Sequence, residues 1–202
     1  KPADLEDLLG PAKFAKDKEE RRDEIGLVNG LAWTSVGGDT LQIEVNVMPG
    51  DGKLQMTGQM GDVMKESAQI ALTYVRSVAD RYGVESRYFK EHDLHLHIPE
   101  GAVPKDGPSA GITMATAMLS AVTGKKVCAS VAMTGEITLR GRVLPIGGLK
   151  EKTLAARMAH MKKVLVPDKN RPDMAEISKE ITKGMEIVFV KTMDDVVREV
   201  FV

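Results

Sequence analysis

Two residues, Ser109 and Lys152, have side chains that can do chemistry and lie in unusual surroundings. Ser109 follows the run Pro104-Lys105-Asp106-Gly107-Pro108, where a glycine- and proline-rich loop meets an uncharged helix. A serine before a helix is most often an N-cap. The glycines and prolines here, however, fix an unusual backbone, and free N–H groups at a helix start favour negative charge. Such a site suits an oxyanion, where one well-placed donor contributes about 3 kcal/mol to a transition state.

The chain does not place an acid and then a histidine after Ser109, as a Ser-His-acid triad of the α/β-hydrolase type would require. The pattern Gly-x-Ser-x-Gly is typical of α/β-hydrolases, which need an acid and then a histidine further along the chain. Only His160 follows Ser109, and no aspartate lies between them, so Glu136 or Glu151 would have to be the acid. The strand-rich segment before Ser109 is too short for that fold. The sequence therefore favours a different base.

A helix predicted over residues 149–160 carries Lys152 in the middle of a stripe of small and apolar side chains. Lys150 projects to the opposite side, beside Arg157. The stripe consists of Leu149, Ala155, Ala156 and Ala159. A lysine so placed either extends to water or is buried with a partly neutral amine. As a base near neutrality it needs its pKa lowered from ~10.4 to about 7 or 8, at a cost of roughly 4 kcal/mol. Burial without a carboxylate partner supplies a shift of that size, so Ser109 and Lys152 fit Ser/Lys nucleophilic catalysis.

Other residues give weaker signals. His95 and His97 alternate on a predicted strand, but no third histidine or cysteine has a helpful spacing for a metal, and strand packing is the simpler interpretation. Cys128 is the single cysteine, predicted in the middle of a strand without a neighbouring base, so neither a disulfide nor a cysteine peptidase is indicated. A lone cysteine fits a reducing, cytoplasm-like compartment.

The loop at Ser109 could instead cradle a phosphate, as in small-molecule kinases, but this alternative leaves Lys152 unexplained. A non-catalytic assembly module is the third hypothesis.

The bulk composition is that of one soluble globular domain. The chain has 202 residues, of which 43% are apolar and 28% charged, enough to bury a core. With 28 basic and 29 acidic residues, the net charge of −1 gives no reason to expect nucleic acid as a partner. The uncharged segment 107–124 is long enough to raise the question of a membrane span. Its many serines and threonines favour a buried core helix.

Periodicity predicts a mixed α/β fold with a β-rich start. Alternating apolar residues predict a strand over residues 41–47, and helical spacing predicts a helix over 63–82 that ends at Gly83. A strand over 94–98 leads into the loop before Ser109, which opens a helix running to about Val122 and ending near Gly124. Further strands are predicted over 127–133, 137–144, 163–166 and 186–190, with helices over 149–160 and 192–200.

The residues around both candidates resemble the proteolytic domain of ATP-dependent Lon proteases of the bacterial and mitochondrial type. The likeness rests on two long runs and extends more loosely from about Gly26 to Val202. The first run is His95-Leu96-His97-Ile98-Pro99-Glu100-Gly101 through Pro104-Lys105-Asp106-Gly107-Pro108-Ser109-Ala110-Gly111. The second is Met133-Thr134-Gly135-Glu136-Ile137-Thr138-Leu139-Arg140-Gly141 through Pro145-Ile146-Gly147-Gly148-Leu149-Lys150-Glu151-Lys152. The resemblance implies the Lon proteolytic-domain fold.

The same resemblance implies Ser109 as the nucleophile and Lys152 as the base of a serine endopeptidase. It also implies that Thr134 lies near the lysine amine, and that the polar surround of the site contains Glu44, His95 and Asp106. Unfolded proteins or peptides are the implied substrates, and six-membered rings of identical chains the implied assembly. The implied location is the cytoplasm, or the mitochondrial matrix in a eukaryote.

The chain contains no Gly-x-x-x-x-Gly-Lys-Ser/Thr phosphate loop, so it is not itself an ATP-driven motor. Since the sequence begins with Lys1 and not methionine, we expect a processed form or a piece of a longer chain. The resemblance implies that an ATPase module, which would use ATP and Mg, precedes it. Residues 1–24, rich in charge, are then the linker from that module, and residues 25–202 form the Ser/Lys peptidase domain. No cofactor, metal, nucleic acid or membrane is expected for this domain.

Overall fold

The computed structural model describes residues 10, 22–34 and 37–202, so most of the predicted linker over residues 1–24 lies outside the described residues. The strands are β1 (Glu24–Ile25), β2 (Leu27–Thr34), β3 (Gly37–Pro49), β4 (Leu54–Thr57), β5 (His92–His97), β6 (Lys126–Val127), β7 (Val131–Met133), β8 (Glu136–Ile137), β9 (Val143–Leu144), β10 (Lys163–Pro167) and β11 (Glu186–Val190). The helices are α2 (Asp62–Val78), α3 (Tyr88–Glu91), α4 (Gly111–Thr123), α5 (Leu149–Met158), α6 (Arg171–Ala175), α7 (Lys179–Thr182) and α8 (Met193–Val200). The described residues also form the short 3₁₀ helices η2 (Ala79–Tyr82) and η3 (Asp168–Asn170).

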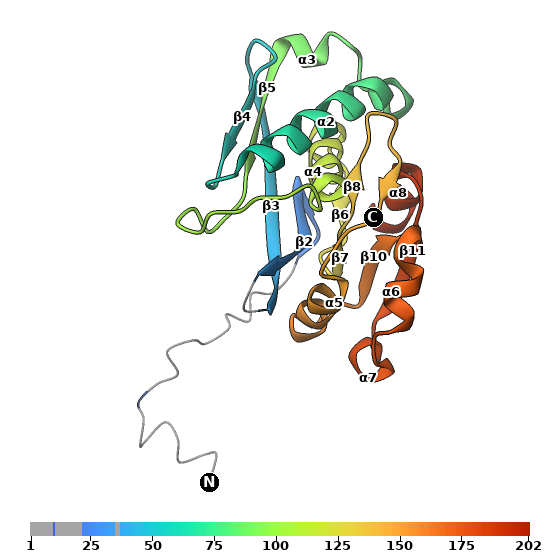
Figure 1. Cartoon of the computed structure of the whole chain (residues 1–202). Coiled ribbons are helices and arrows are strands. Elements are labelled where there is room, and N and C mark those ends of the chain that lie inside the picture. Colours follow the sequence, from blue (N-terminus) through green and yellow to red (C-terminus); the bar gives the residue numbers. More distant parts are fainter. Residues whose placement is uncertain (1–9, 11–21, 35–36) are drawn as a thin grey trace.

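Within the described residues, seven strands form one mixed sheet in the order β11-β10-β7-β2-β3-β5-β4 (Figure 1). β3 pairs antiparallel with β2 and with β5, whereas the other neighbours in this sheet are parallel. Leu41, Ile43 and Val45 of β3 are buried, while Glu44 between them is exposed. This alternation puts one face of the strand against the core. The predicted mixed α/β class with a β-rich start is confirmed.

Helices cover both faces of the sheet, which follows from the opposite directions of neighbouring side chains along each strand. On one face, α4 packs against β2 and β3, and α2 covers α4. On the other face, α5 lies across the same two strands (Figure 1). There Leu31 of β2, Ala132 of β7 and Val164 of β10 pack with Leu149 and Ala156 of α5. Lys152 therefore lies on a helix whose inner side is fixed to the sheet.

Two predicted strands are wrong as single elements. The segment 127–133 is divided into β6 and β7 by a turn at residues 129–130, so Cys128 lies between strands and not within one. The segment 137–144 is a hairpin of β8 and β9, with Gly141 in the left-handed region at φ 71°. Apolar residues on both sides of each turn continue the alternating pattern, so periodicity alone predicts one uninterrupted strand. Gly141 was the local turn signal.

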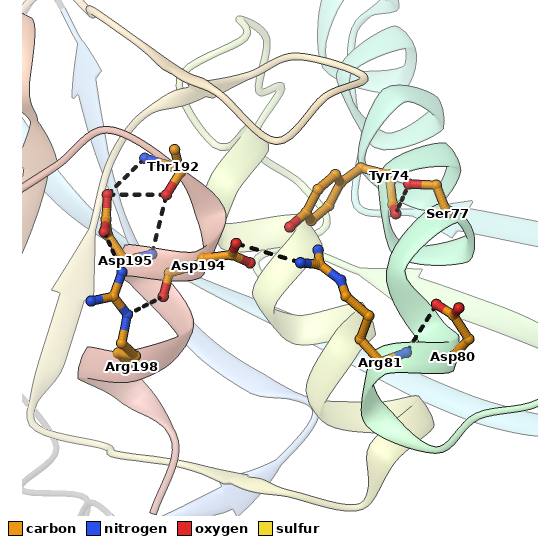
Figure 2. A network of polar contacts seen from close by, with 8 residues as sticks. All are labelled: Tyr74, Ser77, Asp80, Arg81, Thr192, Asp194, Asp195 and Arg198. Atoms are coloured by element: carbon orange, nitrogen blue, oxygen red, sulfur yellow. Dashed lines mark hydrogen bonds and ion pairs between the residues drawn. The ribbon is translucent and has the colours of Figure 1, made fainter.

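The start of α8 is held by a polar network (Figure 2). Thr192 is the N-cap: its hydroxyl accepts from the Asp195 N–H at 3.4 Å, and the Asp195 carboxylate accepts from the Thr192 N–H at 3.0 Å. This reciprocal arrangement is a capping box. Arg81 of η2 forms an ion pair with Asp194 at 3.5 Å, which links the end of α2 to α8. The helix predicted over residues 192–200 is present as α8, which begins at Met193 with Thr192 as its N-cap.

Candidate active site

Ser109 precedes α4 but does not open it, contrary to the prediction. The helix begins at Gly111 with Ala110 as N-cap, and no side chain caps it. The Ser109 hydroxyl is therefore not used as a helix cap, which was the simplest alternative for this residue. The Ser109 carbonyl is fixed: it accepts from the Gly135 N–H at 2.8 Å and from the Thr134 hydroxyl at 3.2 Å. Ser109 itself is half-buried.

Lys152 is buried on the inner side of α5, with 3% of its surface exposed. Lys150 and Arg157 of the same helix are exposed, as the predicted stripe requires. Burial lowers the pKa of the Lys152 amine from 10.5 to about 8. No carboxylate forms an ion pair with this amine within the described part of the chain. No negative charge therefore offsets the cost of removing the ammonium from water, and a large fraction of the amine is neutral near pH 8.

Thr134 joins the two candidates through one hydroxyl. The Lys152 amine donates to the Thr134 hydroxyl at 3.2 Å, and that hydroxyl donates to the Ser109 carbonyl oxygen at 3.2 Å. Thr134 is fully buried at the carboxyl end of β7, where its N–H donates to the Leu165 carbonyl at 3.1 Å. Because the amine is a donor in this contact, the lone pair of its neutral form stays available to accept a proton. The structure thus brings Ser109, Thr134 and Lys152 together.

Asp106 lies in the loop before Ser109 but is directed toward another helix. Its carboxylate accepts from the Met64 N–H at 2.9 Å, in the first turn of α2, and from the Gly107 N–H at 2.8 Å. The first turn of α2 has no cap from its own N-cap residue, Gly61. Asp106 therefore caps α2 from a distant part of the chain and ties the Ser109 loop to it.

His95 lies on β5 and Glu44 on β3, and neither takes part in the hydrogen bonds through Thr134 that join Ser109 and Lys152. His95 Nε2 and His97 Nδ1 both form hydrogen bonds with the Thr57 hydroxyl, at 2.9 and 2.7 Å. Glu44 is exposed and stands opposite His97 in the pairing of β3 with β5. Among the described residues, no group of three or more histidine, cysteine, aspartate or glutamate side chains could hold a metal ion.

Sequence reasoning missed two contributors to these contacts. The Gly135 N–H holds the Ser109 carbonyl, but a backbone donor leaves no side-chain signal in a sequence. Thr57 bridges both histidines from β4, a short edge strand that was not predicted. In the part of the chain described by the structure, no helix has the length and apolar character needed to cross a membrane.

Comparison with known proteins shows the family of this chain. The family model of the Lon protease (S16) C-terminal proteolytic domain matches residues 1–202. The chain is 66% identical over 194 residues to a Lon protease of Lachnoclostridium phytofermentans, covering 96% of this chain and 24% of that protein. It is 54% identical over 195 residues to Lon protease 1 of Myxococcus xanthus, covering 96% of this chain and 24% of that protein. Over 198 residues it is 52% identical to Lon protease 1 of Bacillus subtilis, covering 98% of this chain and 26% of that protein.

The chain spans about a quarter of the length of these relatives. The family match, by contrast, extends over all of its residues, and the mixed sheet with helices on both faces is consistent with that fold. The chain therefore belongs to the family of Lon protease C-terminal proteolytic domains.

Proposed function

We propose that this chain is the peptidase part of an ATP-dependent serine endopeptidase, with Ser109 as nucleophile and Lys152 as general base. The observation that carries the proposal is the buried Lys152 amine, which has a lowered pKa and shares the Thr134 hydroxyl with the Ser109 backbone. Family membership supports a peptidase over the phosphate-binding alternative. It also supports protein substrates, which we propose to be unfolded or damaged.

In the proposed reaction, the Ser109 hydroxyl oxygen attacks the carbonyl carbon of a peptide bond while the neutral Lys152 amine takes the serine proton. The resulting ammonium gives that proton to the leaving amine, and an ester on Ser109 remains. Water then attacks the ester, again with Lys152 as base, and the acid product leaves as Ser109 regains its proton. Among the described residues, the N–H groups of Ser109 and Ala110 have no acceptor, so they are available to stabilise the oxyanion.

Covalent labelling of Ser109 tests this proposal. A fluorescent alkyl fluorophosphonate forms a bond from phosphorus to the Ser109 oxygen, fluoride leaves, and Lys152 takes the serine proton. We expect a single label that mass spectrometry locates on Ser109, and loss of labelling in Lys152→Met. Lys150→Met is the matched control, since Lys150 is exposed on the opposite side of α5, and it should label normally. Equal labelling of both variants, or a label on another residue, would reject the proposed pair.

ATP dependence, the ring and the location belong to the whole protein, and we propose them from family membership. The ATPase module, with its ATP and Mg, is outside this chain, so adding ATP should leave peptide hydrolysis by this chain unchanged. Vigorous ATP-dependent degradation by this chain alone would contradict the proposal. Six-membered rings are expected in the full protein, and light scattering measures whether this chain alone assembles. We place the full protein in the cytoplasm, or in the mitochondrial matrix in a eukaryote.

A further inference from the structure

We propose that Gly38 and Trp33, at the end of the β2–β3 hairpin, act as positioning residues that hold the start of α5 and thereby set the position of the Lys152 amine. We call these two residues the α5 seat. This inference rests on the proposed function, because it concerns where the proposed base lies relative to Ser109. Neither residue touches the reacting atoms, so each would act only through α5.

Gly38 allows the backbone of β3 to approach the backbone of α5 closely. A Cβ atom on Gly38 would lie 2.0 Å from the Glu151 carbonyl oxygen, 2.4 Å from the Glu151 carbonyl carbon and 3.1 Å from the Ala155 Cβ. Real Cβ contacts essentially never fall below 3.0 Å, so α5 would have to move by about 1 Å to admit a methyl group. The obstacle is helix backbone, which cannot turn aside as a flexible side chain would.

Trp33 holds the same helix from the neighbouring strand. It pairs with Gly38 in the β2–β3 register, so both residues are at the same level of the hairpin. The Trp33 ring lies against Gly148, the N-cap of α5, where an added Cβ would be 2.7 Å from the ring Cγ. Trp33 is 59% exposed, so its contact with the helix start is not part of a buried core. The two residues thus contact α5 just before Lys152, at Gly148 and at Glu151.

The position of α5 sets the distance between the Lys152 amine and Thr134, because Thr134 is fixed to the sheet independently of α5. The Thr134 N–H is bonded to Leu165 of β10, whereas Lys152 follows Glu151 on the helix. Moving α5 outward by about 1 Å would lengthen the 3.2 Å contact between Nζ and the Thr134 hydroxyl and admit water beside the amine. Better solvation of the ammonium raises the pKa of Lys152 toward that of an ordinary lysine. A shift of this size at a reacting group costs as much as 100-fold in rate.

Gly38→Ala tests the seat, with Gly147→Ala as the matched control. Gly147 lies in the loop before α5, has no positive φ, and has open space where a Cβ would be. The first measurement is the rate of Ser109 labelling by the fluorophosphonate as a function of pH. We expect Gly38→Ala to label at least about tenfold more slowly at pH 7.5, with its pH midpoint raised by about one unit, and Gly147→Ala to match the parent chain.

The second measurement is tryptophan fluorescence, since Trp33 is the single tryptophan of the chain and contacts the start of α5. Its emission should change in Gly38→Ala and not in Gly147→Ala. A merely less stable variant would lose rate through unfolding but would keep the parent pH midpoint, so a raised midpoint supports the seat. An unchanged midpoint in folded Gly38→Ala overturns it.

If Gly38→Ala does not fold by circular dichroism, Trp33→Leu replaces it. Trp33 is largely exposed, so this substitution removes the contact with Gly148 and leaves the core intact. A raised midpoint in Trp33→Leu supports the seat, and an unchanged midpoint overturns it. Failure of the parent chain to label at all would reject the proposed Ser/Lys chemistry, whereas normal parent labelling with unaffected variants rejects only the seat.

Discussion

Lys152→Met is predicted to make the protein more stable near neutral pH, because it removes a buried ammonium that has no carboxylate partner. Burial lowers the pKa of Lys152 from 10.5 to about 8. A fall of this size corresponds to about 3 kcal/mol of folding free energy at 1.36 kcal/mol per pKa unit. Methionine has a similar length and no charge, so it can fill the same space on the inner side of α5. We therefore expect Lys152→Met to gain up to about 3 kcal/mol at pH 7, less what the hydrogen bond to Thr134 contributed.

The sign of the pH dependence follows from the two pKa values. Below about pH 8 the amine is protonated in both the folded and the unfolded chain, and the folded chain carries the full cost of the buried charge. Between about 8 and 10.5 the unfolded chain binds more protons, so the stability of the parent chain rises with pH. Above about 10.5 both states are neutral and the cost is gone. The advantage of Lys152→Met should therefore be largest below pH 8 and shrink as the pH rises to 10.

Urea denaturation of both chains between pH 7 and pH 10 measures this difference, with Lys150→Met as the control. In thermal denaturation at pH 7, the melting temperature of Lys152→Met should exceed that of the parent by up to roughly 6–12 °C, since 1 kcal/mol shifts a domain of this size by about 2–4 °C. Lys150→Met should match the parent chain at every pH, because Lys150 is exposed. If Lys152→Met is less stable than the parent, or if its advantage does not change with pH, the buried Lys152 ammonium does not destabilise the folded chain.

Substitutions at three further positions separate the reaction from the fold. Thr134→Val removes the hydroxyl between the Lys152 amine and the Ser109 carbonyl, so Ser109 labelling should slow by about 10–100-fold in a kinetic gel assay. An unchanged rate would contradict a role for this hydroxyl in positioning the Lys152 amine. Thr192→Ala removes the capping box of α8 and should lower the melting temperature by roughly 2–4 °C by calorimetry, with normal labelling. Asp106→Ala removes the cap of α2, so it should lower the melting temperature and slow labelling of Ser109. Asp106→Asn keeps an acceptor oxygen and should retain most of the parent's melting temperature and labelling rate. Identical behaviour of the two variants would argue against the capping role.

Local sequence patterns were sufficient to predict α5, which carries Lys152, and the helix α4 that follows Ser109, although not that α4 begins at Gly111. Helical spacing placed Lys152 on the inner side of α5, and the structure buries it there. Gly83 and Gly124, both in the left-handed region, end helices as predicted, because only glycine adopts that conformation without strain. Each of these inferences depends on residues within a few positions of one another, and that is the range over which periodicity and capping are informative.

The contacts between distant segments could not be predicted. Nothing near Asp106 in the sequence shows that its carboxylate caps α2, since Met64 is 42 residues away. The same holds for Gly38, whose close approach to Glu151 exists only once β3 and α5 are packed together. The turn after Cys128 was missed for a different reason: it contains neither glycine nor proline, so nothing interrupts the apolar pattern.

The proposed Ser/Lys chemistry requires that the amine of Lys152 be neutral enough to take the proton of Ser109. An NMR titration of the chain labelled with carbon-13 at the lysine Cε positions measures this amine directly, and Lys152→Met identifies its signal by loss of one resonance. We expect the Lys152 resonance to titrate with a pKa of about 8, well below that of an exposed lysine. A Lys152 resonance that titrates near 10.5 with the exposed lysines would contradict it.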